Sequence, residues 1–137
     1  MSPSLEEQRL EVLNFTDRLT EAQNLYLEGL RLLERDDYAR ASDLICRAAE
    51  MGNATAQCQF GFLHEKGFFG MPDLEMAVSW YRKSVEQCLP QGQFRLGACY
   101  QLGKGVNQDW KEAARLFELA ARRGHAEAAQ CLQVLGK

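Results

Sequence analysis

The sequence predicts an all-α fold, a right-handed α-solenoid of about three helix-turn-helix repeats with capping helices at the N- and C-termini. Three observations support this prediction. The chain repeats itself with a period of about 36 residues. Within each repeat, apolar residues recur at the i, i+3, i+4 spacing of amphipathic helices. No segment shows the alternating pattern that is typical of a half-buried strand.

The internal repeat becomes visible when the chain is aligned with itself at this offset. Gly61 then falls on Gly97, and Asp73 falls on Asp109. A period in this range indicates stacked supersecondary units, each of which buries its apolar face against its neighbours.

Each unit is predicted to contain two helices. In the second unit the turn sequence GFFGMPD separates two apolar stripes. Asp73 and Asp109 stand just before the second helices, where a carboxylate caps free backbone N–H groups. Gly52 and Gly124 follow second helices and suit the left-handed position after a helix end.

The residues before the first repeat predict a further helix. Ser4 and Glu7 have the spacing of a capping box. One apolar stripe then contains Leu5, Val12, Phe15 and Leu19. The predicted domains are an N-terminal capping helix over 1–20 and a repeat domain over 21–137, with units at about 21–52, 53–88 and 89–124 and a closing helix over 125–135.

The third unit, GACYQLGKGVNQDWKEAARLFELAARRGHAEAA, resembles a Sel-1-like repeat of the tetratricopeptide-like superfamily. The match is gap-free, and the residues that carry it are Leu96, Gly97, Tyr100, Gly103, Gly105, Val106, Asp109, Ala113, Phe117, Ala120, Ala121 and Gly124. The second unit departs from the pattern, with His64 in place of tyrosine and Cys88 in place of glycine. The first unit has a shorter turn and is similar to a tetratricopeptide repeat.

Composition narrows the possible partners and compartment. A net charge of −3 gives no basic patch for nucleic acid. No apolar run reaches the roughly 20 residues that span a bilayer, so no membrane insertion is expected. The N-terminus lacks the basic-then-apolar order of a secretory signal, and we therefore expect a cytoplasmic protein. In that compartment five cysteines are expected to be reduced and to pack as small apolar side chains: Cys46, Cys58, Cys88, Cys99 and Cys131.

The stretch GACYQLGKGV raises the possibility of a phosphate-binding loop. Five residues separate Gly97 from Gly103, however, and Gly105 rather than serine or threonine follows Lys104. A phosphate loop also needs a strand before it, whereas a helix is predicted here. The glycines are better explained by close helix packing and by turn geometry.

The sequence offers no candidate catalytic or metal-binding set. Ser79 is followed three residues later by Arg82, so the Ser-x-x-Lys pattern is missing. His64 and His125 stand alone, without the paired histidine or cysteine spacing of a metal site. We therefore predict no catalytic residue, no metal and no cofactor, and expect that the protein is not an enzyme.

The resemblance implies that the first helices line a concave groove that binds a protein or peptide partner. Tyr26, Phe62 and Phe94 would be the aromatic anchors. The positions carried over from tetratricopeptide helices are Gln23, Tyr26, Leu30, Thr55, Cys58, Phe62, Glu65, Gln91, Phe94, Ala98, Gln101, Glu127 and Gln130.

The resemblance thus implies a non-catalytic protein–protein interaction module, an adaptor that holds a peptide or helix in this groove. Alternatives left open are a secretion chaperone or toxin-neutralising partner and, in another class, a small hydrolase. A homodimer through the N-terminal helix or through the open solenoid ends is also left open, as is an N-terminal helix that folds into the groove.

Overall fold

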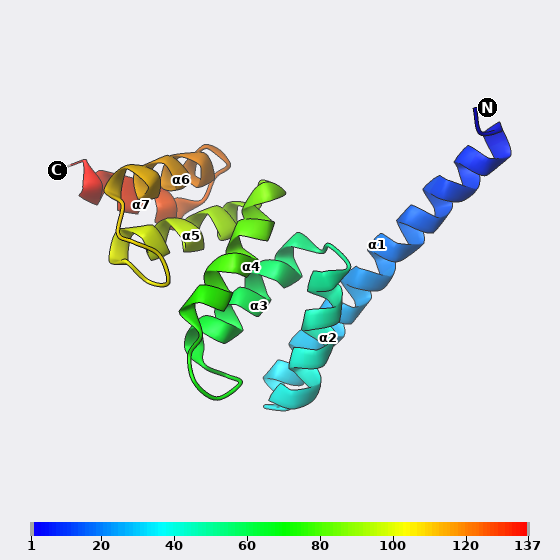
Figure 1. Ribbon diagram of the computed structural model, residues 1–137, viewed down its shortest axis with the longest axis horizontal. Coiled ribbons are helices and arrows are strands. Elements are labelled where there is room, and N and C mark those ends of the chain that lie inside the picture. Colours follow the sequence, from blue (N-terminus) through cyan, green and yellow to red (C-terminus); the bar gives the residue numbers. More distant parts are fainter. Residues whose placement is uncertain (1, 137) are drawn as a thin grey trace. The chain divides into compact units, whose positions relative to one another are not determined.

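The computed structural model describes residues 2–136, and this range contains seven α-helices and no strand (Figure 1). The prediction of an all-helical repeat fold is confirmed. The helices are α1 (Leu5–Glu34), α2 (Tyr38–Glu50), α3 (Ala54–Lys66), α4 (Leu74–Glu86), α5 (Pro90–Leu102), α6 (Trp110–Arg122) and α7 (Ala126–Leu135). They form two compact units, Met1–Asn53 (unit 1) and Ala54–Lys137 (unit 2).

Unit 1 is a helical hairpin in which α2 packs along the C-terminal half of α1. The predicted capping box at the start of α1 is present, since Oγ of Ser4 accepts the N–H of Glu7 and the Glu7 carboxylate accepts the N–H of Ser4. Asp37 caps α2 by accepting the N–H of Arg40. The buried residues of α1 are Ala22, Tyr26, Gly29 and Leu32.

The structure differs from the sequence prediction at the boundary near residue 20. Residues 5–20 do not form a separate helix, because α1 runs without a break from Leu5 to Glu34. No glycine or proline interrupts this stretch before Gly29, so nothing in the local sequence stops the helix. At 30 residues, α1 is about 45 Å long.

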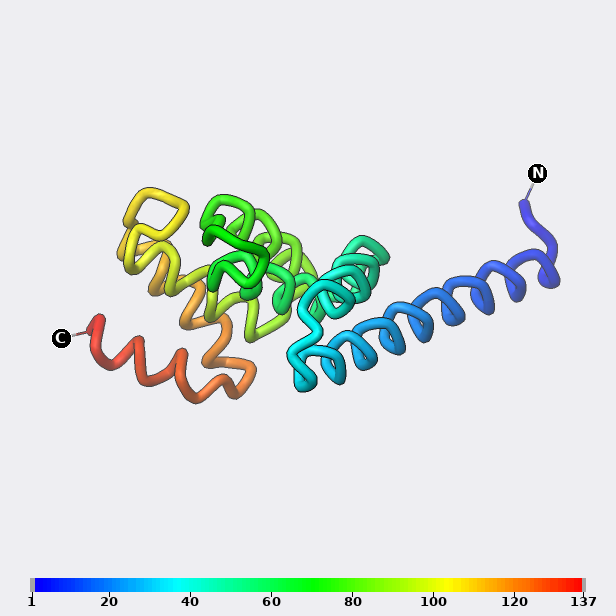
Figure 2. The backbone as a smooth tube through the Cα atoms, turned by 90° about the horizontal axis from the view of Figure 1, so that it is seen from below, coloured from blue at the N-terminus to red at the C-terminus, as the bar shows by residue number. Residues whose placement is uncertain are grey.

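Unit 2 contains two helix pairs and a closing helix. Figures 1 and 2 show α3 beside α4 and α5 beside α6, with α4 also packing on α5 and α6 on α7. One core cluster joins both pairs and includes Tyr81, Leu96 and Leu116. A second cluster around Phe117 and Ala128 fixes α7 to the last pair. The predicted closing helix over 125–135 matches α7 closely.

A glycine lets the two helices of each pair approach closely. Built on Gly97, a Cβ atom would lie 2.8 and 2.9 Å from ring carbons of Phe117. The equivalent atom on Gly61 would lie 2.8 and 2.9 Å from the Tyr81 ring. In unit 1 a Cβ atom built on Gly29 would lie 2.6 Å from Cγ1 of Ile45. Real Cβ contacts are essentially never this short, so any larger residue at these positions would force the neighbouring side chain to shift.

The predicted helix caps are also present. Asp73 accepts the N–H of Met76, and Asp109 accepts the N–H groups of Lys111 and Glu112. These caps begin α4 and α6 at equivalent points of two successive repeats, as the 36-residue period predicts.

The turn after α4 contains an exception to the glycine rule. Gly52 and Gly124, which follow α2 and α6, have φ values of +97° and +90°. After α4 the equivalent turn carries Cys88, which adopts φ +60°. Cys88 is exposed, so the expectation that all five cysteines pack as apolar side chains is wrong at this position. Its place is set by turn geometry rather than by the core.

We predict that Gly97→Ala lowers the free energy of unfolding by up to about 2 kcal/mol. Overpacking a buried contact costs about 1–3 kcal/mol, and better helix propensity returns about 1 kcal/mol of this. Urea denaturation would measure the change. Phe117→Leu should relieve the clash, so that the cost of Gly97→Ala falls by at least about 0.5 kcal/mol in that background. A stabilised Gly97→Ala variant would contradict the account.

We predict that Cys88→Gly raises the free energy of unfolding by about 0.5–1 kcal/mol. Glycine removes the left-handed strain of about 1–2 kcal/mol, and the greater freedom of the unfolded chain offsets part of the gain. Cys88→Ala is the matched control, because it removes the thiol and keeps the strain. Equal melting temperatures for the two variants would show that backbone strain is not the cause.

Candidate functional site

The predicted binding positions of unit 2 lie on α3, α5 and α7, the first helices of successive repeats. We call the surface that these three helices form the first-helix face of unit 2. Its predicted members differ in exposure. Thr55, Glu127 and Gln130 are exposed, and Cys58 is buried at 3% exposure. The intermediate members are Phe62, Glu65, Gln91, Phe94, Ala98 and Gln101.

Four of these predicted residues line one pocket of about 310 Å³ between α5 and α7. The lining is Phe94 and Gln101 from α5, with Glu127, Gln130, Cys131 and Val134 from α7. Phe94, Cys131 and Val134 supply apolar surface, and the two glutamines and the glutamate supply polar groups around it. An apolar surface with a few polar groups at its edge can hold an apolar side chain of a peptide. The backbone of that peptide can then hydrogen-bond to the two glutamine amides.

A histidine at the start of α7 holds this end of the pocket in place. Nδ1 of His125 accepts the N–H of Ala128 and so caps α7. Nε2 of the same ring lies 2.7 Å from the side-chain amide of Gln91. The same ring stacks on Phe94 at a centroid distance of 4.6 Å. His125 is therefore the N-cap of α7, and its ring is half-buried.

Phe62 lies on α3 of the same face, beneath a cation. The guanidinium of Arg95 is 4.2 Å from the centroid of its ring, and Nζ of Lys66 is 5.6 Å away. Neighbouring Glu65 accepts a hydrogen bond of 2.8 Å from the Tyr81 hydroxyl. Glu65 thus joins α3 to α4 as well as lining the face.

Three predicted positions lie in unit 1. Gln23 is exposed, and its Oε1 accepts a hydrogen bond of 3.0 Å from the side-chain amide of Asn53. Leu30 is half-buried, whereas Tyr26 is only 8% exposed. A ring so deeply buried contributes to the core of unit 1 and offers little surface to a partner.

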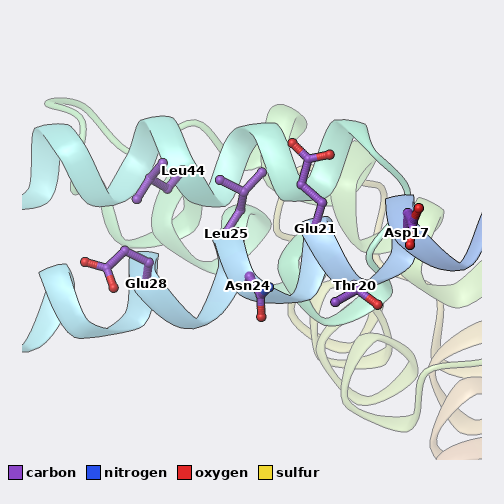
Figure 3. A pocket seen from close by; sticks show the side chains of 7 residues that line it. All are labelled: Asp17, Thr20, Glu21, Asn24, Leu25, Glu28 and Leu44. Carbon is purple, nitrogen blue, oxygen red and sulfur yellow. The ribbon is translucent and has the colours of Figure 1, made fainter. Parts of the chain in front are cut away.

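A pocket that the sequence analysis missed lies in unit 1, between α1 and α2 (Figure 3). It has a volume of about 410 Å³ and is lined by Asp17, Thr20, Glu21, Asn24, Leu25, Glu28 and Leu44. Leu25 and Leu44 are its apolar side chains, and three carboxylates lie around them. The acidic residues Asp17, Glu21 and Glu28 are four and seven residues apart and so share one side of α1, a pattern that is visible in the sequence.

Three cysteine thiols have pKa values above the ordinary range. Burial raises the pKa of the Cys58 thiol to about 11 and that of Cys99 to about 12. Burial, together with the Glu50 carboxylate, raises the pKa of Cys46 to about 11. At neutral pH these thiols are protonated and are weak nucleophiles.

Residues 2–136 contain no cluster of three or more histidine, cysteine, aspartate or glutamate side chains that could hold a metal ion. Over the same range, no helix has both the length and the apolar character that crossing a bilayer requires.

Comparison with known proteins gives a consistent family assignment. The Sel1 repeat family model matches residues 22–53, 54–87 and 90–125. Among curated proteins, DAP3-binding cell death enhancer 1 of Rattus norvegicus is 31% identical over 96 residues, which is 70% of this chain. The chain spans only 18% of that relative's length. It also spans 12% of protein sel-1 homolog 2 of Rattus norvegicus, with 35% identity over 86 residues.

Solved structures show the same architecture. A Sel1 repeat protein from Oxalobacter formigenes superposes with a TM-score of 0.76 at 26% identity, covering 90% of this chain and 97% of its own. Cysteine rich protein B of Helicobacter pylori superposes with a TM-score of 0.70 and covers 94% of this chain and 98% of its own. At 21% identity, the second comparison supports the fold alone.

We predict that His64 makes stability fall as the pH is lowered. Burial among Phe60 and Phe69 lowers the pKa of His64, against the opposing effect of Asp73. The unfolded chain therefore binds the proton more readily, and stability is lost below the ordinary histidine pKa of about 6.5. His64→Tyr, with the residue found at the equivalent Tyr100, should lose less stability between about pH 7.5 and about pH 5.5. Identical pH profiles in thermal melts would contradict this assignment.

Proposed function

Because this chain belongs to the Sel1 repeat family, we propose that it is a non-catalytic adaptor that binds a protein segment on the first-helix face of unit 2. Sel1 repeat proteins are generally helical scaffolds for protein interaction rather than enzymes. The identity of the partner does not follow from the relatives, since the chain covers a small part of their length.

The observation that carries the proposal is the pocket between α5 and α7. Four of the six residues that line it come from positions that family resemblance selected independently of any structure. Its apolar surface is small, which suits one or two side chains of a peptide or helix rather than a large ligand. Phe62, covered by Arg95, extends the same face along α3.

The polar groups of this face favour a peptide over a purely apolar ligand. Side-chain amides donate and accept hydrogen bonds at once, so Gln101 and Gln130 can pair with the N–H and C=O groups of an extended backbone. Because Gln130 is exposed, substitution there should alter recognition without removing packing from the core.

We predict that Gln130→Arg weakens partner binding at least about fivefold, because the longer charged side chain fills the pocket edge and removes the amide. The full chain and its variants would be used as baits for a displayed peptide library, and selected peptides would be measured by fluorescence anisotropy. Gln133→Arg is the matched control, with the same substitution on an exposed residue of α7 outside the pocket lining.

Two results would contradict the proposal. Equal effects of Gln130→Arg and Gln133→Arg would show that the pocket does not contact the peptide. Peptides whose binding depends only on residues of α4 or α6 would place recognition on the opposite surface of unit 2.

A further inference from the structure

The N-terminal part of α1 carries an apolar stripe that nothing in unit 1 covers. Its side chains are largely exposed: Leu5 is 81% exposed, Val12 63%, Phe15 60% and Leu19 50%. Farther along the same helix, Ala22 is 1% exposed, and the stripe continues through buried residues where α2 packs. One continuous packing face thus has a partner helix along only half its length (Figure 1).

The spacing of this stripe is that of a two-helix seam. Its positions 5, 8, 12, 15, 19 and 22 alternate steps of three and four residues, the heptad pattern of helices that pack side by side, and all but Gln8 are apolar. An isolated helix of about 15 residues has marginal stability in water, and most helices in proteins are stabilised by packing of an apolar face. Residues 5–19 therefore need a partner helix, and that helix must carry apolar residues with the same heptad spacing.

The charged residues beside the seam favour a second copy of the same helix in the antiparallel orientation. Glu11 and Arg18 flank the stripe on the same side and are both exposed. In an antiparallel pair of identical helices centred between Val12 and Phe15, Glu11 of one copy lies beside Arg18 of the other, twice by symmetry. In a parallel pair, Glu11 would face Thr16 and Arg18 would face Gln23, and no ion pair would form.

We propose that residues 8–19 of α1 pair antiparallel with the same residues of a second copy of this chain. Val12 of each copy then packs against Phe15 of the other, and Gln8 packs against Leu19 at both ends of the seam. The two-fold axis crosses the helices near their middle, which makes the interface closed and self-complementary. This pairing is independent of the proposed peptide site, because that site lies entirely in unit 2.

The interface is short, so a weak dimer is expected. A seam of about 12 residues buries an area at the low end of specific interfaces, where binding is transient. We expect sedimentation equilibrium of the full chain to show a monomer–dimer transition between about 1 and about 100 µM.

Two similarly exposed apolar residues provide a matched test. Phe15 lies on the stripe and Leu10 lies off it, at 60% and 59% exposure. Phe15→Gln should raise the dimer dissociation constant at least about tenfold, and Leu10→Gln should change it less than about twofold. Circular dichroism of each variant would report whether the helix is retained.

Charge reversal tests the antiparallel arrangement. Glu11→Arg and Arg18→Glu should each weaken self-association, since each places like charges together. The double variant should recover it, and so should an equimolar mixture of the two single variants. A chain that stays monomeric at about 300 µM, equal effects at Phe15 and Leu10, or no recovery on charge exchange would overturn the proposal. A monomer in which unit 2 or another protein covers the stripe would also contradict the proposal.

Discussion

The contact between a glycine on the first helix and a large side chain on the second sets the geometry of every repeat. Gly29 with Ile45, Gly61 with Tyr81 and Gly97 with Phe117 are the same contact made three times. Without a Cβ atom, the backbone of the first helix comes close enough for the partner side chain to lie directly against it. The distance between paired helices is therefore fixed by the glycine and not by a longer, more mobile side chain.

This constraint has a consequence for the surface. Since the second helix occupies the glycine side of the first, the remaining side of the first helix is left for other contacts. On α5 that side carries Phe94 and Gln101, and α7 adds Gln130 and Glu127 beside them. Polar contacts stabilise the same arrangement, as where the buried Tyr81 hydroxyl donates to Glu65 at the edge of the face. The packing of the core and the composition of the candidate site are thus linked through the same helices.

Many features of the fold could be predicted from the sequence because they depend on local chemistry or on the repeat. Asp73 and Asp109 cap helices through neighbouring N–H groups, so their role requires no knowledge of the tertiary structure. The family resemblance selected Phe94, Gln101, Glu127 and Gln130 of α5 and α7, which line one pocket. It could not indicate that Tyr26 is buried, since the exposure of an aromatic side chain depends on the neighbouring helix. The acidic pocket between α1 and α2 requires two helices to be placed together, and a single stripe does not do this.

The account rests on the first-helix face of unit 2 as the surface of recognition. The most direct test is an NMR titration of the isotopically labelled full chain with a bound peptide, mapping the amide shifts by residue. The account predicts that the largest shifts cluster on α5 and α7, around Phe94, Gln101 and Gln130, with smaller changes near Phe62. Shifts concentrated on the exposed surfaces of α4 and α6, with α5 and α7 unaffected, would contradict it.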